Sequence, residues 1–295
     1  MDYTIISNYL DYCKTHKRLS RHTLRAYKND LMQFYNSNKE CVVSYIEGLT
    51  LSNLKTSTLR RKIATLKVFY GYLQSKNVIT DNPFNQLRFQ FRAEKTLPKT
   101  IPHDSLKILY AYLQKKILSA KSDYQKQKAE RNLLIVSLLL STGIRISELC
   151  HIQINDINLT EQTLQILGKG KKERIIFIGD EPTFQLLKAY ISCYCNHTDN
   201  YLFTGKYAQK PLTEQSVRLI LKTARNQTRL TTTITPHMFR HSFATMLLDN
   251  DVDIRYIQQI LGHSSISITQ IYTHVSQSKQ KEILSSCNPI SSIYT

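Results

Sequence analysis

The sequence predicts a mainly α-helical protein with one small antiparallel β-sheet, divided into two domains. Its 295 residues exceed the size of one small domain, and apolar residues recur at helical spacing along most of the chain. Two short β-rich segments, 163–167 and 174–178, flank a turn rich in Gly and Lys, which is typical of a β-hairpin. We expect a helical domain over 1–92, a polar and basic linker over 93–101, and a second domain over 102–295.

Three helical patterns predict the N-terminal domain. Apolar residues recur with helical period over 5–15, Ser20 is placed to cap a second helix, and a third helix spans 57–73. The Asp-Asn-Pro sequence at 81–83 ends this array. Four basic residues of the third helix are left for solvent or for phosphate: Arg60, Arg61, Lys62 and Lys67.

The second domain also opens with a helical pattern. A polar insert, 119–128, precedes an apolar helix over 133–140 that is expected to stop at Gly143. A β-rich segment over 151–157 comes before the hairpin, and helices resume after Pro182. The hairpin therefore supplies most of a small sheet in an otherwise helical domain.

The chain is strongly basic. It holds 40 Lys and Arg against 22 Asp and Glu, a formal net charge of +18, and the excess divides evenly between the two predicted domains. A basic tail would concentrate the charge at one end, whereas two domains that both face DNA explain this division. A polyphosphate is the expected partner, because each neutralised phosphate releases a counterion. RNA, or a basic protein without a nucleic acid, stays open on composition alone.

Some protein classes are excluded by what the sequence lacks. The longest apolar run, 133–140, is less than half of the ~20 residues that a membrane-spanning helix needs, and no signal-peptide pattern follows the N-terminus. Six scattered cysteines are expected to be reduced thiols. No Gly-rich loop for nucleotide phosphates occurs. We therefore expect a cytosolic protein that uses no metal, no cofactor and no ATP.

Two pairs at i, i+3 spacing are candidate anion sites. Arg145 and Glu148 would share one face of a helix. The pair could be structural, or Glu148 could hold Arg145 toward a phosphate, which the guanidinium fork suits. His237 and Arg240 repeat the spacing, with Thr235 as the cap of their helix. A helix start with an Arg and a His makes a phosphate cradle, although such a pair can also be a solvated face.

A histidine and a tyrosine near the C-terminus extend the pattern. On one straight helix His263 and Tyr272 would lie roughly 13 Å apart on opposite faces. Gly262 and the serines at 264–265 instead indicate the end of one helix and the cap of the next. This break would let both side chains face one phosphate. In isolation Tyr272 would be taken for a packing residue, because the chain contains 18 tyrosines.

The turn of the predicted hairpin carries Lys169, Lys171 and Lys172. Such a cluster can be a solvated tip, or it can insert toward a DNA backbone and supply a general acid. Together these signals provide a nucleophile, cations for the non-bridging oxygens and an acid for the leaving oxygen. Cleavage of a phosphodiester without a metal requires this set, and no carboxylate cluster suggests a two-metal site.

At these residues the sequence resembles the tyrosine recombinase/integrase family, and within it the Xer-type site-specific recombinases. The resemblance is carried by TGIRISEL, GKGKKER, TPHMFRHSFAT and LGHSSISITQIYTHV, which match the family's signatures in order and spacing. It implies an N-terminal SAM-like four-helix DNA-binding domain and a tyrosine-recombinase catalytic domain. It also implies cutting and rejoining of DNA strands through a 3′-phosphotyrosyl intermediate and a Holliday junction.

The resemblance also implies roles for single residues. Arg145 and Arg240 would bind the scissile phosphate, with Glu148 in a supporting role. His237 would act as base or phosphate ligand, and His263 would be the second histidine of the catalytic set.

Two further residues complete that set. Lys169 would protonate the departing 5′-oxygen, and Tyr272 would be the nucleophile. Six other residues are candidates for DNA contact, mainly through phosphates: Arg60, Arg61, Lys171, Lys172, Arg218 and Arg225.

The partners that the resemblance implies are double-stranded DNA with a specific core site and a homo- or heterotetramer on it, which could include a paralogous recombinase. Chromosome or plasmid dimer resolution in the cytoplasm is the expected role. The segment 115–128 is longer and more basic than a typical Xer helix connection, so an integrase of a mobile element stays open. A topoisomerase-like relaxing enzyme and a non-enzymatic DNA-binding protein are two further alternatives, and the intact catalytic set counts against the second.

Overall fold

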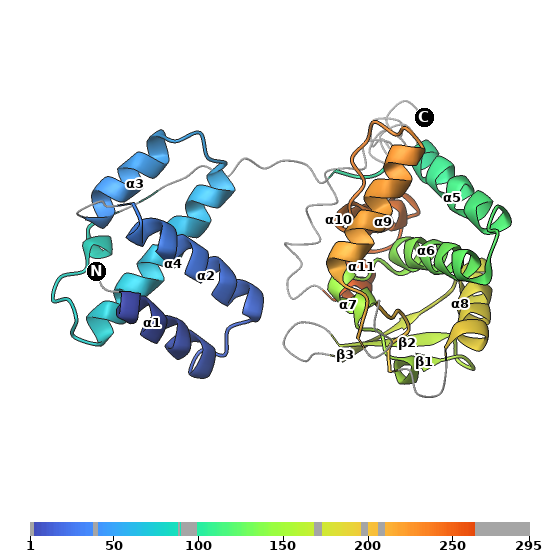
Figure 1. Cartoon of the computed structure of the whole chain (residues 1–295), viewed down its shortest axis with the longest axis horizontal. Helices are drawn as coiled ribbons and strands as arrows, with labels where there is room; N and C mark the ends of the chain where they lie inside the picture. Colours follow the sequence, from blue (N-terminus) through green and yellow to red (C-terminus); the bar gives the residue numbers. More distant parts are fainter. Residues whose placement is uncertain are drawn as a thin grey trace, which may run out of the picture. The chain divides into compact units, whose positions relative to one another are not determined.

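The computed structural model describes residues 3–37, 41–87, 89, 99–167, 173–195, 200–205 and 210–262. Most of the predicted linker lies outside the described residues, as do five of the predicted site residues: Lys169, Lys171, Lys172, His263 and Tyr272. The chain divides into two compact units, 1–95 and 96–295, and each is considered by itself (Figure 1).

The N-terminal unit is helical. Helices lie at the three predicted positions, and a further helix, over 42–51, was not placed by the predicted patterns. The Ser20 hydroxyl accepts a hydrogen bond from the backbone N–H of Thr23 at 3.2 Å, which confirms the predicted cap. Fully buried Tyr9 and Phe69 pack edge to face in its core, with ring centroids 5.0 Å apart. The described elements are α1 (Tyr3–Thr15), α2 (Arg21–Tyr35), α3 (Val42–Leu51), α4 (Thr56–Ser75) and a 3-10 turn, Pro83–Asn85.

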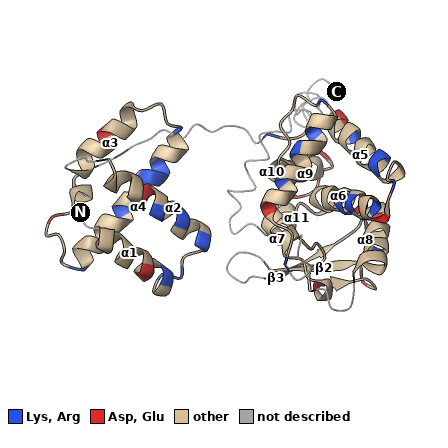
Figure 2. Ribbon diagram, in the orientation of Figure 1, with Lys and Arg blue, Asp and Glu red and all other residues tan. Residues whose placement is uncertain are grey.

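One prediction for α4 is wrong. Lys62 is buried, with 7% of its surface exposed; it donates to Gln33 Oε1, and its Nζ lies 3.8 Å from a carboxylate oxygen of Asp30. Arg61 donates to the same Asp30, and Thr65 Oγ1 donates to it at 3.1 Å. A buried carboxylate needs such partners, so Asp30 draws Lys62 inward, whereas the side chain of Arg61 stays 45% exposed. Figure 2 shows the basic residues along α2 and α4.

The second unit is built around α6, which contacts α5, α8 and α10 (Figure 1). Four of its residues, Leu134, Ile135, Leu138 and Leu139, are fully buried. The unit's described elements are α5 (His103–Leu118), α6 (Asp123–Thr142), α7 (Ile146–Cys150), a 3-10 turn (Ile154–Asp156), β1 (Ile157–Asn158), β2 (Thr163–Leu167), β3 (Glu173–Phe177), α8 (Glu181–Tyr194), α9 (Glu214–Gln227), α10 (Pro236–Asp249) and α11 (Ile254–Leu261).

The three strands form one antiparallel sheet in the order β1-β2-β3, which confirms the hairpin. Ile166 lies opposite Arg174 in its register. The strand predicted over 151–157 is wrong for most of its length, because only its last residue belongs to β1. Gln153 N donates to the Asp156 carboxylate at 2.9 Å, and such a local side-chain bond favours a turn over an extended strand.

The polar insert is largely helical. Ser122 caps α6 by accepting from Gln125 N at 3.3 Å, so the helix begins ten residues before its apolar part. The charged residues of 123–131 face solvent or a cavity. This part of the helix therefore shows no recurring apolar residues by which the sequence could have predicted it. None of the helices in the described part of the chain combines the length and the apolarity that crossing a bilayer requires.

Gly143 ends α6 in the left-handed conformation, at φ +62°. An added Cβ would lie 2.4 Å from Phe243 Cδ1 and 2.8 Å from Leu261 Cδ2. Gly143→Ala is therefore expected to lower the free energy of unfolding by about 1–3 kcal/mol or more, from backbone strain and overpacking. Urea denaturation measures this loss. Gly205→Ala is the control, since its Cβ would meet Pro211 O at an ordinary 3.5 Å; equal stability of the two variants would contradict the expectation.

Candidate active site

Arg145 and Glu148 contact each other, but through a helix cap rather than a helix face. Arg145 is the residue that caps α7. Its backbone N donates to Glu148 Oε2 at 2.8 Å, and its Nη1 donates to Oε1 at 2.8 Å. The side chain of Glu148 is 4% exposed and that of Arg145 is 33% exposed. Glu148 is thus buried behind an arginine that still reaches solvent.

A third residue, Arg174, completes this arrangement and was not singled out by the sequence. Its Nη1 and Nη2 donate to the two carboxylate oxygens of Glu148 at 3.0 and 2.8 Å, a bidentate pair. Alternate residues of a β-strand face the same side, so Arg174 lies on the same face of β3 as the buried Ile176, whereas Ile175, which is 72% exposed, lies on the other face. The alternation was obscured because two of the outward positions of β3, Ile175 and Phe177, are apolar too.

The protonation of Glu148 follows from these contacts. Burial raises the pKa of the carboxyl. The hydrogen bonds from Arg174 and Arg145 and the positive charge of Arg174 lower the pKa by more than burial raises it, so the pKa lies below its ordinary value. Glu148 therefore stays ionised at neutral pH and holds both guanidinium groups by charge as well as by hydrogen bonds.

Arg240 is buried, with 5% of its surface exposed. The Thr235 hydroxyl caps its helix, α10, as predicted, accepting from Met238 N at 3.3 Å. Arg240 Nη1 donates to Gly143 O at 2.7 Å, at the end of α6. A cation at a helix C-terminus is favoured by the helix dipole. Arg240 thus fixes the end of the core helix next to the loop that carries Arg145.

The arginines also converge on the end of α11, where three consecutive carbonyls each accept one hydrogen bond. The donors and acceptors are Arg174 Nε to Ile260 O at 3.1 Å, Arg240 Nη2 to Leu261 O at 2.6 Å and Arg145 Nη2 to Gly262 O at 3.3 Å. Gly262 lies in the left-handed conformation at φ +64° and ends α11, which confirms the predicted helix end. The structure therefore ties the arginines to the three residues that directly precede His263.

The two histidines of α10 flank Arg240. His237 is exposed and His241 is partly buried. Burial lowers the pKa of His241, and the charges of His237 and Arg240 lower it further. His241 is therefore neutral near pH 7, and His237 is the solvent-exposed histidine in the first turn of α10.

The other candidates for DNA contact have internal partners of different kinds. Arg61 pairs with Asp30 as described above, and Arg60 is exposed on α4. Arg218 donates to Glu214 at 2.7 Å within α9, whereas Arg225 donates to two backbone carbonyls beyond that helix. Their contact with DNA stays a prediction. Among the described residues no group of three or more His, Cys, Asp or Glu is placed to hold a metal ion.

Comparisons with known proteins identify the family of the chain. A family model described as the phage integrase family matches residues 100–279, and one described as the N-terminal SAM-like domain of phage integrases matches residues 6–77. These matches confirm the predicted fold class, a SAM-like helical domain followed by a catalytic domain with a small antiparallel sheet.

Relatives that match over nearly the whole chain indicate the same family. A tyrosine recombinase of Agathobacter rectalis is 47% identical over 97% of this chain and 96% of its own length. The tyrosine recombinase XerC of Thermodesulfovibrio yellowstonii is 34% identical over 97% of this chain and 96% of its own length. The XerH site-specific recombinase in a post-cleavage complex with a palindromic difH substrate has the same fold, with a TM-score of 0.72 and 24% identity over 95% of this chain and 84% of that chain. The chain therefore belongs to the tyrosine recombinases of the phage integrase family, enzymes that break and rejoin DNA strands.

Proposed function

We propose that this enzyme is an Xer-type site-specific recombinase that resolves chromosome or plasmid dimers in the cytoplasm, in association with the nucleoid. Its substrate is double-stranded DNA with a specific core site, on which it acts as a homo- or heterotetramer. The XerC relative over nearly the whole chain supports the Xer role. The XerH complex with difH and the net charge of +18 support DNA as the partner.

The observation that carries the proposed chemistry is the convergence of three arginines on the carbonyls of 260–262. Arg145, one third exposed, and Arg240 present guanidinium groups beside the point where the chain continues to His263. A phosphate at this point gains charge-assisted hydrogen bonds from a planar fork on each side. Glu148 and Arg174 hold that geometry before DNA arrives, as electrostatic stabilisation of a transition state requires.

In the proposed reaction the Tyr272 phenol oxygen attacks the scissile phosphorus and loses its proton to His237. Arg145 and Arg240 bind the non-bridging oxygens of the pentavalent transition state, with His263 beside them. The bond from phosphorus to the 5′-oxygen breaks, and Lys169 gives that oxygen its proton. The 3′-phosphotyrosyl bond conserves the energy of the broken bond. Attack by the 5′-hydroxyl of the partner strand then rejoins the DNA.

An integrase of a mobile element is the second candidate. The same residues would perform the same chemistry, and the matching family model is described as the phage integrase family. Sequencing of DNA that the enzyme selects from a fragmented host chromosome separates the two roles. Recovery of one chromosomal core site supports dimer resolution, whereas recovery of the ends of a mobile element supports integration.

Covalent trapping tests the chemistry. A duplex that carries the selected core site, with a nick beside the scissile phosphate, loses its 5′-hydroxyl fragment and leaves the cleaved strand on the enzyme. We expect a denaturation-resistant adduct with the parent enzyme and none with Tyr272→Phe. Tyr256→Phe is the matched control, because Tyr256 is a solvent-exposed tyrosine of α11. Equal adduct from Tyr272→Phe and the parent enzyme contradicts the assignment of the nucleophile.

A further inference from the structure

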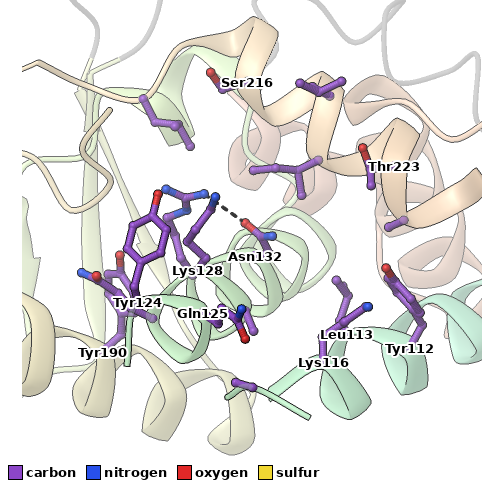
Figure 3. Close-up of a pocket in the computed structure, with 18 of the residues that line it drawn as sticks. Tyr112, Leu113, Lys116, Tyr124, Gln125, Lys128, Asn132, Tyr190, Ser216 and Thr223 are labelled. Atoms are coloured by element: carbon purple, nitrogen blue, oxygen red, sulfur yellow. Dashed lines mark hydrogen bonds between the residues drawn. The ribbon is translucent and has the colours of Figure 1, made fainter. Parts of the chain in front are cut away.

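The second unit contains a cavity of about 880 Å³ that the recombination chemistry does not use. The end of α5 and the first half of α6 form one side, and α9 faces them (Figure 3). None of Arg145, Glu148, Arg174 or Arg240 lines it. Seven of its lining residues belong to the segment 115–128, which includes the polar insert: Lys116, Ser119, Ala120, Tyr124, Gln125, Gln127 and Lys128. Residues of this segment thus line a cavity that is separate from the arginine cluster.

The charges that line the cavity have one sign. Lys116, Lys128 and Arg131 line it, and no Asp or Glu is among its described lining residues. Lys128 Nζ lies 4.9 Å from the centroid of the Tyr124 ring, and the two side chains lie side by side in Figure 3. This cation–π contact orients the ammonium group without neutralising it. The positive charge is therefore available to a bound anion.

Arg131 is the partly buried cation of this group. Among the described residues its buried Nε has no hydrogen-bond partner, and the bond that its Nη2 makes there is a long one, 3.4 Å to Asn132 Oδ1, shown as a dashed line in Figure 3. Within the described part of the chain no carboxylate forms an ion pair with it. Burial lowers the pKa of the guanidinium, and only the hydroxyls of Tyr190 and Tyr124 act against that shift.

A partly buried guanidinium with a fully buried, unsatisfied Nε is costly unless an anion completes it. Structural buried arginines are normally paired with a carboxylate or with carbonyls, as Arg240 is here. Arg131 instead lies in a cavity whose volume falls within the range of small-molecule sites, roughly 300–1,000 Å³. Its neighbours supply further donors, the Lys128 ammonium and the side-chain amides of Gln125 and Asn132.

Part of the cavity wall is apolar. Leu113, Leu212, Ile220 and Ala224 line it, together with Leu219, which is 61% exposed although it is a large apolar side chain. An apolar group bound here would remove this surface from water. We propose that the cavity binds a small organic anion, with its phosphate or carboxylate group on Arg131 and Lys128 and its apolar part against α9.

Calorimetric titration and thermal unfolding of the full-length protein test this site. Three probes separate the possible head groups: inorganic phosphate, citrate and thymidine 5′-monophosphate. We expect the monophosphate ester to bind more tightly than inorganic phosphate, because only the ester reaches the apolar wall, and to raise the melting temperature. Tighter binding of citrate would assign the head group as a carboxylate within the same proposal.

Arg131→Met separates a binding role from a structural one. It removes the charge at similar length, so we expect the protein without a probe to melt at the same or a higher temperature and affinity for the best probe to fall by about 10-fold or more. Lys128→Met is expected to weaken the probe less, because Lys128 is exposed. Lys126→Met, an exposed lysine of α6 that does not line the cavity, is the control and should leave affinity unchanged.

Three results would overturn the proposal. The first is the absence of binding by every probe. The second is a lower melting temperature of Arg131→Met with unchanged probe affinity, which would make Arg131 a structural residue. The third is displacement of the probe by duplex DNA together with weaker DNA binding by Arg131→Met, which would identify a contact to the DNA backbone instead.

Discussion

Arg240→Lys is expected to reduce single-turnover cleavage of a nicked core-site duplex by about 10²–10³-fold, the effect of losing one donor to a developing charge. Lysine keeps the positive charge but not the planar fork. The guanidinium of Arg240 binds Gly143 O and Leu261 O, and one ammonium with a shorter reach cannot bind both carbonyls and the proposed phosphate together. The variant is expected to bind DNA almost as well as the parent enzyme, since sequence-independent phosphate contacts elsewhere dominate affinity.

The same substitution is expected to lower stability, because a buried carbonyl without a donor costs about 1–3 kcal/mol. Urea denaturation measures this loss, with Arg225→Lys as the control: Arg225 also donates to two backbone carbonyls but is only partly buried. The control should lose less stability than Arg240→Lys. Cleavage by Arg240→Lys within tenfold of the parent enzyme would show that charge alone suffices and would contradict the fork geometry.

Glu148→Gln is expected to lower the free energy of unfolding by about 3–5 kcal/mol at neutral pH. The glutamine has the same shape, but it leaves Arg145 and Arg174 without the buried charge that both now contact, and breaking a buried pair costs about this much. Cleavage should fall too, because Arg145 loses the partner that fixes its direction. Glu214→Gln is the matched control. Its pair with Arg218 is half exposed, so its loss is expected to stay below about 1 kcal/mol.

The pH dependence of the two proteins distinguishes a charge effect from a packing effect. The pKa of Glu148 is lower in the folded protein than in the unfolded chain, so its stabilisation is fully present above the unfolded value, about 4.3. It is lost as the pH falls below that value and through the lowered folded pKa. The difference in unfolding free energy between parent and Glu148→Gln should therefore shrink between about pH 4 and more acidic solution. A constant difference over this range would contradict the charge argument.

Local interactions explain what could be predicted from the sequence. Ser20 and Thr235 cap helices because their hydroxyls reach a backbone N–H three residues on. Gly143 and Gly262 end helices because glycine enters the left-handed region without strain. Two β-rich segments around a short turn pair with each other. All these interactions lie within one turn or one hairpin, so their spacing in the sequence is sufficient to predict them.

Contacts between distant segments could not be predicted in this way. Arg174 and Glu148 are 26 residues apart, and Arg240 lies 97 residues from Gly143. The burial of Lys62 beside Asp30 depends on how α2 and α4 pack. The apolar pattern of the sequence also failed to predict the first ten residues of α6, because most of them line a cavity or face solvent instead of packing into the core. None of these outcomes has a fixed sequence spacing, because each depends on which helices meet.

The sequence by itself determined the helical fold class, the helix ends, the hairpin and the two basic pairs that indicate a phosphate-cleaving enzyme, because each rests on interactions between residues close in the chain. Only the tertiary structure decided that Arg174 shares Glu148 with Arg145, that three arginines bind consecutive carbonyls before His263, and that residues of the insert line a cavity with cationic side chains. These features join segments that approach each other only when buried side chains pack, and close packing, rather than local preference, fixes where each guanidinium lies.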